Sequence, residues 1–283
     1  MRVRPAAVAG TWYPGTAGAL TRDLDAYIEA ADVRVSGQVQ AIIAPHAGLM
    51  FSGPVGAYAY KAAASGSYDV AFLVGPSHFT AFDGVSIWSE GQFDSPLGPA
   101  VIHDEAAAEM LRSPIVRDLP AAHKREHSLE MQLPFLRHLL PDVPIVPLLI
   151  GHQTRETIET LSQVLAAAAR TRRALLIGST DLSHYFDAQT AAGLDARVQD
   201  HVQRFDAPGL LDLFETYPEG ERGRYVACGG GAAIAVMMAA QVQGATSARV
   251  LKYAHSGEIS GDYDGVVGYL AAAFGGFSKH DVH

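Results

Sequence analysis

Short runs of consecutive apolar residues, rich in Val, Ile and Leu, recur along the chain between segments with a longer hydrophobic period. Such runs are typical of strands that are buried on both faces of a sheet. The clearest runs occupy residues 39–45, 69–76, 143–151, 173–179 and 247–254, with a shorter one at 84–89. We expect each of them to form a strand.

The segments between most of these runs carry apolar residues at three- and four-residue spacing, or are rich in alanine. Both features favour α-helices. The clearest helical segments are residues 17–31, 156–170, 191–205 and 230–242. Residues 128–140 follow a helical pattern too, but Pro134 has no amide donor and should start this helix late or kink it.

Strands that alternate with helices predict an α/β fold in which a mostly parallel or mixed sheet is covered on both faces. No linker rich in Pro, Gly or Ser, no repeat and no low-complexity segment divides the 283 residues. With 48% hydrophobic residues, the chain can bury one large core. We therefore expect a single domain over residues 1–283.

The charge pattern narrows the classes of partner. The formal net charge is −9, and basic residues cluster only in short pairs such as Arg172-Arg173, which argues against a surface for nucleic acid or anionic membranes. No apolar run approaches the ~20 residues that span a bilayer. The single cysteine, Cys228, excludes an internal disulfide framework and fits a reducing compartment. We expect a cytoplasmic protein whose partner is a small molecule or another protein.

Three histidines follow predicted strands directly. They are His46 in APHAG, His78 in GPSHF and His184 in STDLSHY, and the last motif also holds Asp181. In open α/β sheets, ligands bind beyond the carboxyl ends of the strands. A single histidine there can simply be satisfied by local hydrogen bonds, but three at equivalent positions favour a shared site. Asp181 either orients a neighbouring imidazole or forms an Asx-turn after its strand.

Cys228 stands immediately before a glycine run and a predicted helix. The positive end of the helix dipole favours the thiolate, which binds metals or attacks electrophiles. The alternative is a small buried apolar residue, the usual state of a free cysteine. Two further candidates, His127 and Glu130, are three residues apart and share a helical face if the helix already includes them. They either bind substrate and move protons or form a capped, solvated helix start.

Taken together, seven motifs resemble those of the Memo family, also called the AmmeMemoRadiSam system protein B family. They are GTWYP, APHAGLMFSG, LVGPSHF, EHSLEMQLPFL, STDLSHY, ACGGGAA and SGDYDGVVGYLA, in the family's order over essentially the whole chain. The family is similar to class III extradiol ring-cleavage dioxygenases, which are non-haem iron enzymes. The resemblance implies a three-layer α/β/α sandwich with one site at the strand ends.

The resemblance also implies roles for individual residues. His46, His78 and Cys228 match the family's metal-site residues, and His184 with Asp181 matches the dioxygenases' acid/base position. His127 and Glu130 then become substrate-binding groups around the site. Two departures from the dioxygenase pattern stand out: a thiolate replaces the carboxylate ligand, and Phe79 occupies the position where many relatives have a second histidine. Thiolate softens the site toward copper or zinc.

The leading hypothesis is a metalloprotein with a redox-active iron(II) or copper site, zinc being a further candidate, which acts with oxygen on a small molecule. A second hypothesis makes Cys228 a metal-free nucleophile. A third is a non-catalytic module that binds a protein or peptide and retains a vestigial pocket. The family name implies association with radical-SAM and AMMECR-like proteins. Because Cys228 is the only cysteine, any iron–sulfur centre would belong to such a partner.

Overall fold

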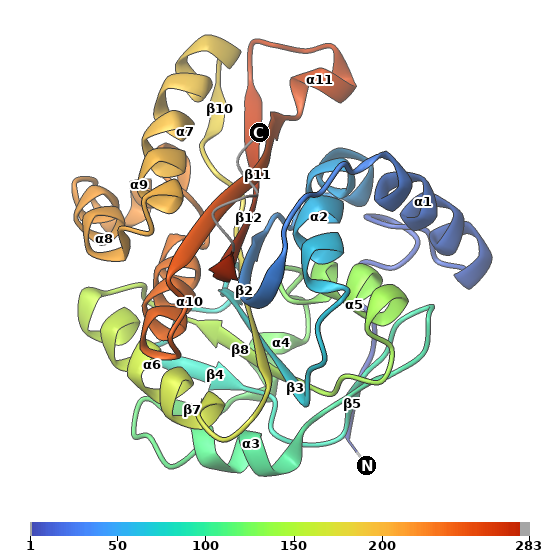
Figure 1. The fold of residues 1–283 in the computed structure, drawn as a ribbon, viewed down its shortest axis with the longest axis vertical. Helices are drawn as coiled ribbons and strands as arrows, with labels where there is room; N and C mark the ends of the chain where they lie inside the picture. Colours follow the sequence, from blue (N-terminus) through green and yellow to red (C-terminus); the bar gives the residue numbers. More distant parts are fainter. Residues whose placement is uncertain (1, 278–283) are drawn as a thin grey trace.

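The computed structural model describes residues 2–277, which form a three-layer α/β/α sandwich around one large mixed sheet (Figure 1). The sheet formed by these residues has nine strands, in the order β10-β12-β2-β9-β3-β8-β4-β7, with β11 paired to β12. Their bounds are β2 Gly37–Ala44, β3 Val70–Pro76, β4 Val85–Ile87, β7 Val116–Asp118, β8 Ile145–Ile150, β9 Ala174–Ser179, β10 His184–Phe186, β11 Ser247–His255 and β12 Val266–Phe277. The α/β class is confirmed.

The centre of the sheet is parallel and its margins are antiparallel. Strands β2, β9, β3 and β8 run parallel, whereas β12 is antiparallel to β2, β10 and β11, and β4 is antiparallel to β8. The central strands read as continuous apolar runs because helices cover both of their faces. A small second sheet joins β1 (Val3–Arg4), β5 (Gln92–Phe93) and β6 (Ala100–Val101).

Helices α1 (Ala17–Ala30), α2 (Leu49–Ala63) and α5 (Leu133–Leu139) form one outer layer, in which α2 packs on β2 and β12. The opposite layer contains α6 (Arg155–Ala169), α7 (Ala188–Gln203), α8 (Ala207–Glu215) and α10 (Gly230–Val242). The shorter helices are α3 (Asp104–Met110), α4 (Pro120–His123), α9 (Glu219–Tyr225) and α11 (Gly257–Ser260). Both faces of the sheet are therefore covered, as predicted.

All six predicted strands and the four clearest predicted helices are present, with ends shifted by a few residues. Pro134 acts as predicted: a 3₁₀ helix at Glu130–Gln132 precedes α5, which has this proline in its first turn. The segments that form β12 and α2 were not among the predicted elements. His280 and His283 lie outside the described residues.

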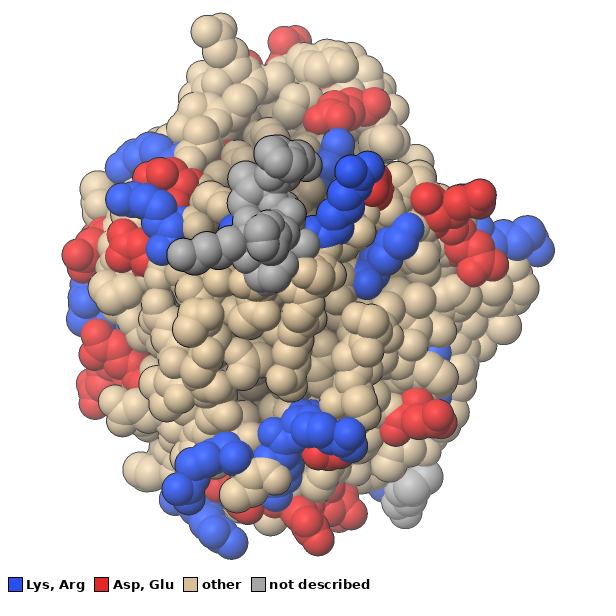
Figure 2. All heavy atoms as spheres, viewed as in Figure 1, with Lys and Arg blue, Asp and Glu red and all other residues tan. Residues whose placement is uncertain are grey.

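The surface carries charged side chains of both signs. On the face shown in Figure 2, basic and acidic side chains are intermixed in small groups. Within residues 2–277, no single helix is long and apolar enough to cross a membrane. One pair, α9 and α10, meets that test together by length and composition, but it is bent by 81°.

Adjacent parallel strands bring distant parts of the chain to one edge of the sheet. His46 lies two residues beyond the end of β2, His78 two beyond β3, and Asp181 two beyond β9, which is the strand between them. The carboxyl ends of parallel strands meet at the same edge of a sheet. The fold therefore gathers these side chains at one place.

Candidate metal centre

His46 is 2% exposed, and its ring is fixed by a buried hydrogen-bond network. Its Nδ1 lies 2.9 Å from Ser179 Oγ at the end of β9. The Ser179 hydroxyl donates to the Ser128 carbonyl at 2.6 Å and accepts from the Gln132 amide at 2.8 Å, so it can only accept from His46 Nδ1–H. The network thereby selects the imidazole tautomer whose Nε2 lone pair is free.

His78 is held by Glu126, which lies in the loop after α4. One Glu126 oxygen accepts from the His78 amide at 2.6 Å and the other lies 2.8 Å from its Nδ1. Burial raises the pKa of Glu126, but hydrogen bonds from His78 and from nearby backbone amides outweigh burial and lower it to about 2. The ionised carboxylate therefore takes Nδ1–H, and Nε2 is the nitrogen left for a ligand.

Cys228 directly precedes the first turn of α10. Its Sγ lies 3.2 Å from His46 Nε2 and accepts from the Asp181 amide at 3.4 Å. Burial raises the pKa of the thiol, but the charge and hydrogen bond of His46, with a hydrogen bond from His78, lower it to about 6. Burial lowers the pKa of His78, yet hydrogen bonds to Cys228 and Glu126 outweigh it and raise the pKa to about 10. The site thus favours a thiolate beside an imidazolium.

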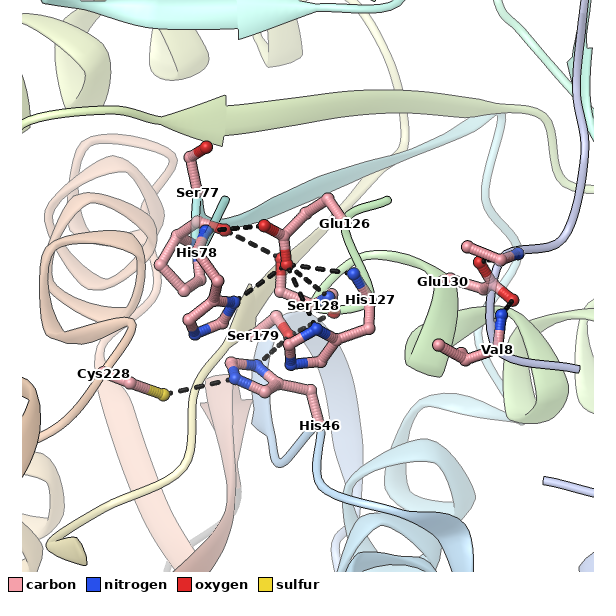
Figure 3. Close-up of polar contacts among 12 residues, drawn as sticks. Val8, His46, Ser77, His78, Glu126, His127, Ser128, Glu130, Ser179 and Cys228 are labelled. Carbon is pink, nitrogen blue, oxygen red and sulfur yellow. Dashed lines mark hydrogen bonds and ion pairs between the residues drawn. The ribbon is translucent and has the colours of Figure 1, made fainter. Parts of the chain in front are cut away.

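The structure brings the three predicted ligands together. Ligand atoms of His46, His78 and Cys228 all lie within 4.8 Å of one another, and Figure 3 shows the sulfur and the two imidazoles grouped at the strand ends. They line a cavity of about 530 Å³. A cavity of this size suits a small molecule.

Asp181 and His184 line the same cavity. Asp181 Oδ1 accepts from the amides of His46 and Ala47 at 2.8 and 3.3 Å, so it positions the neighbouring loop instead of forming an Asx-turn in its own. Burial raises the pKa of Asp181. His184 Nδ1 is buried and has no hydrogen-bond partner among residues 2–277. With Cys228, these two residues offer a second group of ligand atoms within 4.8 Å.

The structure separates His127 from Glu130, the other pair that was predicted at the site. His127 lines the cavity, where its ring stacks on His78 with centroids 4.6 Å apart and an interplanar angle of 12°. Burial, followed by the charges of His46 and His78, lowers the pKa of His127 to about 3, so this imidazole is neutral. His127 precedes the 3₁₀ helix, and the pair does not share a helical face.

Glu130 does not line this cavity and is fully buried elsewhere. Its carboxylate pairs with Arg4 and accepts from the amides of Ala7 and Val8 at 2.8 and 3.0 Å and from the Tyr13 hydroxyl at 2.8 Å. Figure 3 shows it well apart from the histidine cluster. This position does not support a direct contact with substrate and gives Glu130 the role of anchoring the N-terminal segment.

A family model described as "Memo-like protein" matches residues 4–273. The chain belongs to the Memo family. A MEMO1 family protein of Methanosarcina mazei is 36% identical over 274 residues, covering 96% of this chain and 98% of the relative. A MEMO1 family protein of Nitrosopumilus maritimus is 30% identical over 279 residues, covering 96% and 99%.

The fold of this Memo-family chain is also similar to that of a solved structure. The crystal structure of an uncharacterized protein from Escherichia coli K12 aligns with a TM-score of 0.57 at 14% identity, covering 84% of this chain and all of that chain. At this identity the likeness concerns the fold alone.

Sequence reasoning missed two residues that shape the site of this Memo-family chain and left open whether a third, Trp12, covers a pocket or only packs against other rings. Glu126 follows no strand, and only its position beside His127 pointed to it. Trp12, in the motif GTWYP, lines the cavity with its ring centroid 4.3 Å from that of His127. Arg224, on α9, also lines the cavity, and no pattern in the sequence indicated it.

Replacing Glu126 with glutamine is expected to weaken iron(II) or copper(I) binding by about 10–100-fold, the usual cost of losing an outer partner of a ligating histidine. The neutral amide can present an N–H to His78 and so no longer enforces the required tautomer. Anaerobic titration of the folded variant measures the loss, with Glu29→Gln on exposed α1 as the matched control. Equal affinities in the two variants would contradict the orienting role.

Proposed function

We propose that this Memo-family protein is a metalloprotein in which His46, His78 and Cys228 hold a redox-active iron(II) or copper ion for an oxygen-dependent reaction on a small molecule. The observation that carries the proposal is the convergence of these three ligand atoms within 4.8 Å at the floor of the cavity. A closed structural zinc site would instead use four protein ligands.

The chemistry of the donor set fits such an ion. Hydrogen bonds occupy Nδ1 of both histidines, so Nε2 is the nitrogen each would offer, His78 by giving up its Nε2 proton to the ion, and the thiol is acidified. Two imidazoles and one thiolate suit copper, iron or zinc and leave positions for other molecules. When bound, the ion would supply Lewis acidity and electron transfer.

The chain's own residues would position the reactants and transfer protons. Asp181 holds the backbone of His46 in place. The ring of His127 stacks on His78, and the tilted ring of Trp12 lies against it, so both line the cavity. His184 lines the cavity, and its buried Nδ1 has no partner in residues 2–277, so no protein hydrogen bond fixes that nitrogen while the ring holds or passes a proton.

The test is metal analysis of protein purified without added metal, followed by anaerobic titration with iron(II) and copper(I). Stoichiometric binding of either ion at one site supports the proposal. A folded wild-type protein that binds neither ion would overturn it. Binding of zinc alone would overturn the redox part of the proposal.

His184→Ala is expected to retain the bound ion, with an affinity within about threefold of wild type, because His46, His78 and Cys228 remain intact. Any turnover should fall by roughly 10²–10⁴-fold, the typical contribution of a general acid or base. Metal content and turnover are measured on the same preparation. Metal loss as large as that in His46→Ala would make His184 a ligand instead.

A second candidate function rests on the 3.2 Å separation of Cys228 Sγ and His46 Nε2. This pair is arranged as a nucleophile and its base, in which the imidazole takes the thiol proton and the thiolate attacks an electrophilic carbon. It predicts turnover in metal-free protein that iodoacetamide abolishes. Activity that requires added metal would exclude it.

A further inference from the structure

We propose that the molecule bound in this cavity is a small aromatic carboxylate, whose anionic group is held by Arg224 and whose ring lies against Trp12 and Tyr185. The inference rests on the proposed function, because it assumes that the cavity at the histidine–cysteine cluster is the substrate site. It adds the chemical class of the substrate, which the ligand set alone does not define.

Arg224 is an exposed cation that lines the cavity and has no counter-ion within residues 2–277. No ion pair or hydrogen bond joins its side chain to another residue in the described range 2–277. Other arginines, such as Arg22, also lack an ion pair among the described residues, but Arg224 is the arginine that lines this cavity. A guanidinium left free in a cavity is a ready partner for a ligand anion.

The orientation of Arg224 suits a bidentate contact. Its guanidinium carbon lies 4.9 Å from the centroid of Phe186 and 5.7 Å from that of Tyr225. Stacking on these rings satisfies the flat face of the guanidinium and leaves its N–H edge available. That edge matches the two oxygens of a carboxylate.

Two aromatic side chains of the cavity wall are unusually exposed. Trp12 is 39% exposed and Tyr185 is 70% exposed, although both line the cavity. Tyr185 also has a φ of 63°, in the left-handed region that residues with a Cβ rarely adopt. Such backbone strain persists mainly where a function uses it. Large exposed rings beside a free cation therefore indicate a ligand with a ring of its own.

The remaining wall does not oppose an anion at this end. The cavity-lining carboxylate is Asp181, which is 4% exposed and accepts hydrogen bonds from backbone amides. Gly223, the neighbour of Arg224 in the sequence, and Val267 line the cavity without charge. A volume of about 530 Å³ holds one substituted ring and leaves room at the cluster.

The experiment compares benzoate with its neutral isostere benzamide, using Trp fluorescence on wild-type protein both with and without iron(II). Trp88 is 4% exposed, so quenching reports mainly on Trp12. We expect benzoate to bind at least about tenfold more tightly than benzamide, the size of one charge-assisted contact. Acetate should bind far more weakly than benzoate because it lacks the ring.

Two variants and one control test the assignment. Arg224→Met should remove the preference for benzoate, whereas Tyr185→Ala should weaken benzoate and benzamide by the same factor. Arg22→Met, which removes an exposed arginine of α1, should change neither. Phenyl phosphate in place of benzoate tests the alternative anion, and tighter binding of the phosphate would overturn the choice of carboxylate.

Equal binding of benzoate and benzamide, failure of both to bind, or a preference that survives Arg224→Met would each overturn the inference. Metal binding by Arg224→Met should equal that of wild type, since Arg224 is not among the grouped ligand residues. A protein that prefers benzoate but binds no metal would refute the proposed function and leave the anion site standing.

Discussion

Cys228→Ser should lower the affinity for iron(II) and copper(I) by more than about hundredfold, since loss of even an outer partner costs about 10–100-fold. Serine keeps the size of the side chain but replaces a soft thiolate with a hydroxyl that stays protonated at neutral pH. His46→Ala and His78→Ala should show losses of the same order, because each removes one of three ligands. Anaerobic titration of purified variants measures the affinities.

The controls separate ligand loss from unfolding. Circular dichroism should show that each variant keeps the wild-type secondary structure, and His152→Ala removes an exposed histidine that does not line the cavity. If the folded Cys228→Ser protein binds as tightly as wild type, the thiolate is not a ligand. A third ligand must then be sought among Asp181 and Glu126.

Glu130→Gln is expected to lower the free energy of unfolding by about 3–5 kcal/mol, the cost of breaking a buried ion pair from one side. Arg4 is 1% exposed, and its charge would remain buried without its carboxylate. The same substitution also weakens contacts to the amides of Ala7 and Val8. Urea unfolding followed by circular dichroism measures the change.

The matched control is Asp32→Asn, which breaks the exposed pair between Asp32 and Arg34. An exposed pair contributes about 0–1 kcal/mol, so this variant should unfold close to wild type. The double variant Arg4→Met/Glu130→Leu should recover part of the loss, because no unpaired charge remains. If Glu130→Gln costs no more than Asp32→Asn, the pair does not anchor the N-terminal segment.

The strands that could be predicted are buried strands with consecutive β-branched and leucine residues, such as Val70–Pro76 and Ile145–Ile150. Strand β12 is different, because after its first two valines it is mostly alanine and glycine. Its extended form comes from pairing with the preceding strand β11 and with β2, which is distant in sequence. Local propensity carries little information about such pairing.

Helix α2 was not predicted from the sequence for a similar reason. It contains Pro54 and two glycines, residues that disfavour an isolated helix. At Gly53 a Cβ would lie 2.7 Å from the Tyr27 ring, so the glycine permits close packing of α1 on α2. The benefit appears only when both helices are in place.

The candidate site was predictable where topology decides position. His46, His78 and Asp181 follow neighbouring strands, and the strand-end rule places them together. Glu126 and Arg224 come from a loop and a short helix whose positions depend on tertiary packing. Glu130 was wrongly placed at the site. The prediction assumed that a helix already includes His127, but the 3₁₀ helix begins three residues after His127, at Glu130 itself.

The order of strands and site residues along the chain also determines when the site can assemble during synthesis. Strand β12, the last in the chain, lies between β2 and β11, and Cys228 follows the two histidines by about 150 residues or more. A ribosome that has made only the first 200 residues has produced both imidazoles but not the sulfur. The nascent chain at that stage carries an incomplete set of the proposed ligands, and under the proposed function an ion could be held by all three only after Cys228 has been made.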